Sequence, residues 1–175
     1  MPEELGLVPR ELPGHLKVGG YYDTEPLRDF RSGETERGTW GMYVAIDQKV
    51  WSEDDATGAQ GLSLFAAFHH APPDVNAQSD FFDAGAVYVG LIPGRDTDVT
   101  GLYFAYGSFS GDLRHSQRDA GLPGQVYESV LELNYRWNVL PWFYLQPDIQ
   151  GIINPGAAHQ FGDALVLAMQ VGVPF

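Results

Sequence analysis

The sequence of 175 residues contains no cysteine, which excludes disulfide bonds and a cysteine redox pair. Cationic side chains are scarce: 10 Lys and Arg stand against 23 Asp and Glu, for a net charge of −13. Because nucleic-acid binding depends on cationic patches, this balance argues against DNA or RNA as a partner. No segment approaches the ~18 apolar residues of a membrane helix. No stretch shows a sustained 3.6-residue apolar period, so we expect little helix.

Two-residue alternation of apolar side chains is the dominant pattern instead. It is clearest at the end of the chain, where Leu165, Leu167, Met169, Val171 and Phe175 fall on one side. A period of two predicts a strand with one apolar face. A final strand that ends on an aromatic residue is characteristic of bacterial outer-membrane β-barrels.

Eight such segments occur, each followed by a breaker and each long enough to cross a membrane as a tilted strand of ~9–11 residues. They span residues 15–23, 40–51, 61–70, 82–92, 99–109, 126–139, 142–153 and 164–175. The connections alternate between short ones (93–98, 138–141) and longer ones rich in Gly, Pro and charge (25–38, 71–80, 111–124, 154–163), with 52–60 intermediate. Outer-membrane barrels pair short periplasmic turns with long outer loops in this way. The predicted fold class is therefore all-β, an antiparallel transmembrane β-barrel with about eight strands present, formed by residues 14–175 after a lead segment 1–13.

The second face of several segments is polar, as in 126–139, where Leu131 and Leu133 oppose Glu132 and Asn134. A porin lines its water-filled lumen with such a face, whereas a soluble sandwich turns it to bulk water. The charged and amide groups suit weak hydrogen bonding to sugars; the alternative is a hydrated face without ligand preference. The aromatic rings suit stacking on sugar rings; the alternative is an aromatic girdle at the rim or the filling of a narrow lumen. The candidate lumen-lining residues are Lys17, Tyr21, Tyr43, Asp47, Lys49, Trp51, Glu128, Glu132, Asn134, Arg136, Tyr144, Gln146, Asp148 and Gln150.

Longer motifs are more specific. Residues 13–22 read PGHLKVGGYY, 61–65 read GLSLF and 90–96 read GLIPGRD; residues 128–155 read ESVLELNYRWNVLPWFYLQPDIQGIINP and 163–175 read DALVLAMQVGVPF. Together these stretches resemble the C-terminal half of the carbohydrate-selective porins, the OprB family. The resemblance implies a sixteen-stranded outer-membrane barrel for passive sugar diffusion, of which this chain holds the last eight strands.

Several expectations follow from the resemblance. The expected location is the bacterial outer membrane. The opening Met1-Pro2-Glu3-Glu4 lacks the features of a secretory signal, so either the chain is processed, engineered or truncated, or the membrane interpretation is wrong. The partners are mono- or oligosaccharides, outer-membrane lipid, and either a homo-oligomeric partner or another barrel segment. No cofactor is expected.

Two other architectures stay open: a small closed eight-stranded barrel without conduction, and a soluble β-sandwich that binds carbohydrate. A glycosidase would need two carboxyl groups ~5–9.5 Å apart. Glu128 and Glu132, four residues apart on one strand, are about 13 Å apart at ~3.3 Å per residue, which is too far. Carboxylate pairs across neighbouring strands stay open, but we expect no enzyme and no catalytic residue. His69 and His70 face opposite ways on a strand and cannot jointly bind a metal, and the acidic pairs 54–55 and 96/98 are interpreted as solvated turns, so no metal site is predicted.

Overall fold

The computed structural model describes residues 12–53 and 58–174 as one antiparallel sheet with a single short helix. The predicted end on Phe175 and most of the lead segment 1–13 lie outside the described residues, as does the acidic pair 54–55. The elements in chain order are β1 (Gly14–Arg28), β2 (Thr35–Ser52), β3 (Gly61–His70), β4 (Gln78–Val89), β5 (Val99–Phe109), α1 (Gly111–Asp119), β6 (Tyr127–Leu140), β7 (Phe143–Ile153) and β8 (Ala164–Gly172).

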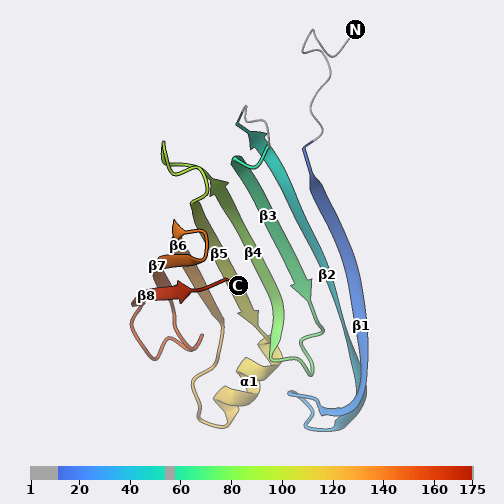
Figure 1. The fold of residues 1–175 in the computed structure, drawn as a ribbon. Helices are drawn as coiled ribbons and strands as arrows, with labels where there is room; N and C mark the ends of the chain where they lie inside the picture. The colour runs from blue at the N-terminus through green and yellow to red at the C-terminus, as the bar shows by residue number, and fades with distance from the viewer. Residues whose placement is uncertain (1–11, 54–57, 175) are drawn as a thin grey trace, which may run out of the picture.

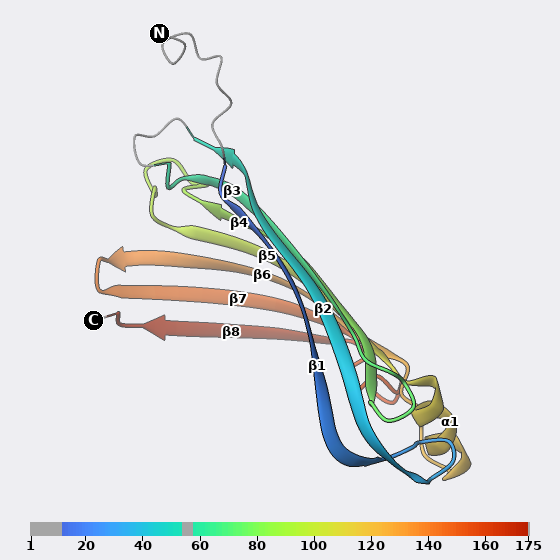
Figure 2. The ribbon, with the colours of Figure 1, turned by 90° about the vertical axis from the view of Figure 1, so that its right-hand side faces the viewer.

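The strands are arranged in the order of the sequence, so each pairs with its neighbours in the chain, as in a meander. Figure 1 shows β1 and β8 at opposite ends of the sheet, and Figure 2 shows β6 to β8 turned away from the direction of β1 to β3. The sheet is thus twisted and curved, as chiral strands require. It is also open, because β1 pairs only with β2 and β8 only with β7 among the described strands.

Burial shows that this sheet has no second layer. Among the described residues the only buried apolar side chains are Ala105 and Ala157. A soluble β-sandwich would enclose a core between two sheets. Neither the sandwich nor the closed eight-stranded barrel is therefore the arrangement that the described strands adopt.

The predicted alternation of long and short connections holds only after β5, where 110–126 is long, 141–142 is short and 154–163 is long. Before β5 the prediction is wrong: β4 ends at Val89, so the connection expected to be short spans 90–98 and is longer than 71–77, which the sequence predicts to be long.

Two further differences concern the elements in the connections. The first long connection is mostly strand, since β1 extends to Arg28 and β2 begins at Thr35. The connection after β5 contains α1, which no apolar period predicts. Its N-cap is Ser110, whose hydroxyl accepts hydrogen bonds from the N–H groups of Asp112 and Leu113, both at 3.1 Å. Ser110 is fully buried and donates to the Pro73 carbonyl, so it also joins this loop to the β3–β4 loop.

Pro147 lies inside β7, where a residue without an N–H removes one ladder hydrogen bond. The pairing of β6 with β7 is interrupted at this point, between Asn134↔Asp148 and Trp137↔Leu145. On its other side Pro147 still pairs with Met169 of β8. Within the described parts of the chain no helix has the length and apolar character needed to cross a membrane.

Candidate functional site

Cross-strand pairing divides the side chains between the two faces of the sheet. One row of paired residues, with one residue from each of the eight strands, illustrates each face. Opposed residues of an antiparallel pair point to the same side. The row on what we call the polar face is His15, Asp47, Phe65, Gly85, Tyr103, Glu132, Gln150 and Val166. The adjacent row on the apolar face is Leu16, Ile46, Ala66, Ala84, Phe104, Leu131, Gly151 and Leu165.

The polar face is densest in hydrogen bonds over β6 and β7. Glu132 accepts from the amide groups of Asn134 at 2.8 Å and Gln150 at 3.2 Å. Four residues further along β6, Arg136 donates to Gln146 at 3.0 Å, and its guanidinium lies 4.5 Å from the centre of the Tyr144 ring. These contacts hold long polar side chains along the sheet surface.

Other predicted lining residues of these two strands share the same face. Asp148 lies opposite Asn134 in the register, and Gln146 lies opposite Gln170 of β8. Glu128 lies nearer the long loops, where its carboxylate accepts the Gly156 N–H at 2.6 Å. The structure therefore brings the predicted residues of β6 and β7 together on one surface.

Charged groups also line this face over β1 and β2. His15 Nδ1 lies 2.8 Å from an Asp47 carboxylate oxygen. Lys17 is opposite Ala45, and Lys49 donates to the carbonyls of Gly58 and Ala59 at the edge of the intermediate connection. Lys49 is thus tied to the turn, whereas Lys17 stands in an open part of the face.

Aromatic rings on the polar face lie over glycines of the neighbouring strand. A Cβ at Gly41 would come within 2.4 Å of the Tyr21 ring, and one at Gly19 within 2.5 Å of the Tyr43 ring. The same relation holds for Tyr144 over Gly172, at 2.1 Å. Each ring therefore lies with one side against backbone. Tyr43 also stacks on His69, and the Arg136 guanidinium lies over Tyr144, so Tyr21, at 57% exposed, has the most open ring of the three.

Trp51 is the predicted lining residue that the structure places elsewhere. The register shifts between Lys49 and Trp51, so Trp51 pairs with Leu62 instead of continuing the alternation. Its ring lies 5.9 Å from that of Tyr88, which belongs to the apolar face. The prediction that Trp51 shares the face of Lys49 is wrong, because a β-bulge inserts one extra residue and reverses the side to which the next one points.

The sequence interpretation missed several polar-face residues of β3 to β5. His69 stacks on Tyr43, with ring centres 5.8 Å apart, and contacts Phe81 at 5.9 Å. Phe65 stacks on Tyr103 across Gly85, with ring centres 6.1 Å apart. Asp83 shares the face, opposite Ala67 and Ala105. The two-residue alternation is the sequence signal for these residues. Carried from β6 to the neighbouring strands through their paired positions, it assigns them to the polar face.

The two adjacent histidines do face opposite ways, as the sequence predicts. His70 Nδ1 lies 2.8 Å from an Asp80 carboxylate oxygen, and its ring is 5.7 Å from Trp40. These partners lie on the side opposite Tyr43 and Phe81. The pair therefore cannot supply two ligands to one metal ion.

Asp98 is not a solvated turn residue, so that expectation is wrong. It is 2% exposed and receives hydrogen bonds from Arg95 at 2.7 Å, from the Asn138 N–H at 2.9 Å and from the Tyr135 hydroxyl. Burial acts to raise the pKa of Asp98, but the hydrogen bonds from Tyr135, Arg95 and Asn138 outweigh it and hold the pKa below its ordinary value. This group joins the β4–β5 turn to β6.

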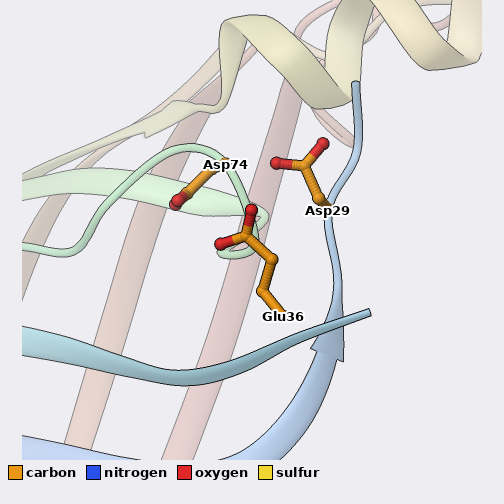
Figure 3. Close-up of side chains that lie close together, drawn as sticks. All are labelled: Asp29, Glu36 and Asp74. Carbon is orange, nitrogen blue, oxygen red and sulfur yellow. The ribbon is translucent and has the colours of Figure 1, made fainter. Parts of the chain in front are cut away.

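An acidic group lies at the end of the long loops, where Asp29, Glu36 and Asp74 have carboxyl oxygens within 4.8 Å of one another (Figure 3). Asp29 already closes the β1–β2 turn by accepting the N–H groups of Arg31 at 2.8 Å and Ser32 at 2.6 Å. The Ser32 backbone bond is the largest cause that lowers the pKa of Asp29. These contacts account for Asp29 as a turn residue, and we assign no ligand to the group.

The comparisons with known proteins agree with this geometry. The family model described as carbohydrate-selective porin, OprB family, matches residues 4–175. Porin B of Pseudomonas aeruginosa is 28% identical over 208 residues, which cover 100% of this chain and 45% of Porin B. The high-pH structure of Pseudomonas putida OprB matches with a TM-score of 0.87 at 26% identity, over 94% of this chain and 45% of that chain. This chain thus spans less than half the length of either relative.

Proposed function

Since this chain belongs to the carbohydrate-selective porin family, OprB, we propose that its eight strands form part of the wall of a passive sugar channel in the bacterial outer membrane. In this arrangement the polar face surrounds the lumen and the apolar face meets lipid. The observation that carries the proposal is the division of one uncovered sheet into these two faces.

The exposure of the apolar face supports contact with lipid. Leu131, Leu133 and Ile149 are between 41% and 53% exposed, and Leu165 and Leu167 are 69% and 73% exposed. In water, side chains of this size gain about 1.5–3 kcal/mol each when they are buried. A bilayer removes that surface from water without requiring a second protein layer.

The polar face supports weak interaction with sugars. Amide, carboxylate and guanidinium groups such as Gln150, Glu132 and Arg136 can exchange hydrogen bonds with water for hydrogen bonds with sugar hydroxyls at little net cost. Tyr21, which lies against Gly41 and is 57% exposed, presents a flat apolar surface on which a sugar ring can stack. Weak contacts of both kinds favour entry and still allow release, as conduction requires.

The proposed activity is diffusion without a chemical step. Mono- or oligosaccharides move down their own gradient through a hydrated lumen, so we assign no catalytic residue and no cofactor. Selectivity then depends on the width of the lumen and on the donors, acceptors and rings that line it.

Sugar block of ion current tests the proposal. Mono- and disaccharides are titrated against single-channel current in a planar bilayer, for the parent channel and for a variant with Asp47, Glu132, Arg136 and Asp148 all replaced by Ala. We expect folding to persist, because none of the four side chains is buried in a core, and we expect sugar block to change.

The matched control replaces Glu34, Asp96, Arg118 and Asp119 by Ala. These four residues are exposed and lie outside the strands, in the β1–β2 turn, the β4–β5 turn and α1, and their replacement changes the net charge by the same amount. We expect parent-like block in the control. Identical block in the parent and in the polar-face variant would show that these side chains do not form the sugar lining.

A further inference from the structure

One row across the polar face places aromatic rings directly beside hydrogen-bonding side chains. From β3 to β7 the row consists of Phe65, Gly85, Tyr103, Glu132 and Gln150, and each residue is the register partner of the next. Opposed residues of this kind have Cβ atoms about 4.5–5.5 Å apart. Neighbouring side chains of the row can therefore act on the same small molecule.

The aromatic part of the row depends on a glycine. Adjacent strands lie about 4.7–4.9 Å apart, so β3 and β5, with β4 between them, are separated by roughly twice that distance. The ring centres of Phe65 and Tyr103 are nevertheless 6.1 Å apart. A Cβ on Gly85 would come within 2.3 Å of the Phe65 ring, so Phe65 leans across β4 through space that a residue with a side chain would fill.

Phe65 and Tyr103 together form what we call the aromatic platform. Their ring planes are 21° from parallel, and at 6.1 Å between centres the pair is offset, so each ring covers only part of the other. Both side chains are only partly buried. The polar face therefore presents a nearly flat apolar surface at this point.

The polar part of the row begins directly beside the platform. Glu132 is the register partner of Tyr103, and its carboxylate accepts the amide groups of Asn134 at 2.8 Å and Gln150 at 3.2 Å. These two bonds hold the carboxylate in place. A carboxylate has about four acceptor sites, so it can still accept a hydroxyl group from a ligand that lies on the platform.

We propose that this row is a subsite for one cyclic sugar, which places the C–H face of its ring on the aromatic platform and donates a hydroxyl group to Glu132. The inference rests on the proposed function and adds the residues that select a ring-shaped sugar. A pyranose has a flat apolar face with hydroxyl groups at its edge, so it uses both parts of the row at once. The reduced open-chain sugar keeps the hydroxyl groups but has no rigid flat face, so the subsite favours the cyclic form.

Block of ion current by glucose and by sorbitol, its reduced open-chain counterpart, tests the subsite. Both are titrated against the single-channel current of the parent channel and of Tyr103→Leu, which keeps an apolar side chain but removes the flat ring. We expect glucose to block the parent at a lower concentration than sorbitol does. In the variant the half-blocking concentration of glucose should rise about two- to ten-fold, whereas that of sorbitol should change less than about two-fold.

The matched control is Phe104→Leu, the same kind of change at the next residue of β5. Phe104 pairs with Ala84 and Leu131 on the apolar face, so its replacement should leave block by both compounds as in the parent. Tyr103→Phe keeps the ring and loses only the hydroxyl group, so it should retain the preference for glucose. If Tyr103→Leu forms no channels, Phe65→Leu removes the other ring of the platform and should have the same effect.

Two results would overturn the subsite: equal block of the parent by glucose and sorbitol, which needs no variant, or parent-like block by glucose in the leucine variants of the platform. The proposed function is judged separately. Block that changes in the four-residue variant of the polar face but not in Tyr103→Leu removes the platform and leaves the sugar channel in place. A parent channel that no sugar blocks contradicts both.

Discussion

Asp98 is a buried carboxylate at the end of the β4–β5 turn, 2% exposed. Its carboxylate receives hydrogen bonds from Arg95, from Tyr135 and from the Asn138 backbone. Its own backbone carbonyl accepts the Gly90 N–H at 2.9 Å, which closes the β4–β5 turn. A buried, fully bonded carboxylate of this kind fixes two strands relative to each other.

Replacement of Asp98 by Asn therefore weakens the fold. The neutral amide keeps the shape but loses the charge-assisted bond from Arg95, and hydrogen bonds to charged groups contribute about 1.5–3 kcal/mol. We expect the free energy of unfolding to fall by about that amount at neutral pH. Urea titration of the protein in detergent micelles measures it.

The dependence on pH has a definite sign. Because the pKa of Asp98 is lower in the fold than its ordinary 3.8, its contribution is fully present above pH 3.8. It is lost as the pH falls through the lower folded value. Asp96→Asn, in the same turn but exposed, is the matched control and should stay within about 0.5 kcal/mol of the parent. A variant D98N as stable as D96N would show that the network contributes nothing.

At the scale of the element, β6 gives the sharpest test of which face meets lipid. Leu133 pairs with Leu102 and Ile149, and Asn134 pairs with Gly101 and Asp148, so the two adjacent residues point to opposite faces. Spin labels at Leu133 and Asn134 in a bilayer should report opposite environments. We expect the label at 133 to be accessible to oxygen and the label at 134 to be accessible to a polar reagent in water.

A charge substitution measures the same difference as energy. Leu133→Arg should destabilise the protein by about 2–4 kcal/mol if this residue lies near the bilayer midplane, whereas Asn134→Arg should cost less. The two variants are matched controls for each other, because they add the same side chain to adjacent positions. Equal accessibility at both positions, or equal loss of stability, would contradict the assigned faces.

Most of the sheet could be predicted because its signal is local. Strict alternation in 126–139 and 142–153 determines both the strands and their faces, and β3 and β5 begin and end where the sequence predicts. Trp51 could not be placed, because a bulge depends on pairing with β3 and has no mark in β2 itself. Ser110 and Asp98 could not be assigned either, since their partners Pro73, Tyr135 and Asn138 are 37 to 40 residues away.

At the scale of the whole molecule, the stability of the fold depends on whether water or hydrocarbon surrounds the sheet. Folding of a soluble domain relies on apolar side chains removed from water, and that gain must offset about 1–2 kcal/mol of backbone entropy per residue. Here the described part of the chain buries only two apolar side chains, Ala105 and Ala157. The sheet by itself therefore lacks the burial of apolar side chains, which is the main contribution that stabilises a fold in water.

The solvent requirement of the fold is the last prediction. Without detergent or lipid, we expect the purified chain to stay unfolded or to aggregate, because single-layer strands leave residues such as Val18 and Leu167 more than 70% exposed. In micelles or vesicles with a hydrocarbon interior the same chain should acquire a β-sheet signal in far-ultraviolet circular dichroism, since lipid covers the apolar face. Sedimentation in parallel separates a folded species from aggregates. A monodisperse, β-rich species in plain buffer would contradict the membrane assignment, because it would require a water-excluding core that the open sheet does not provide.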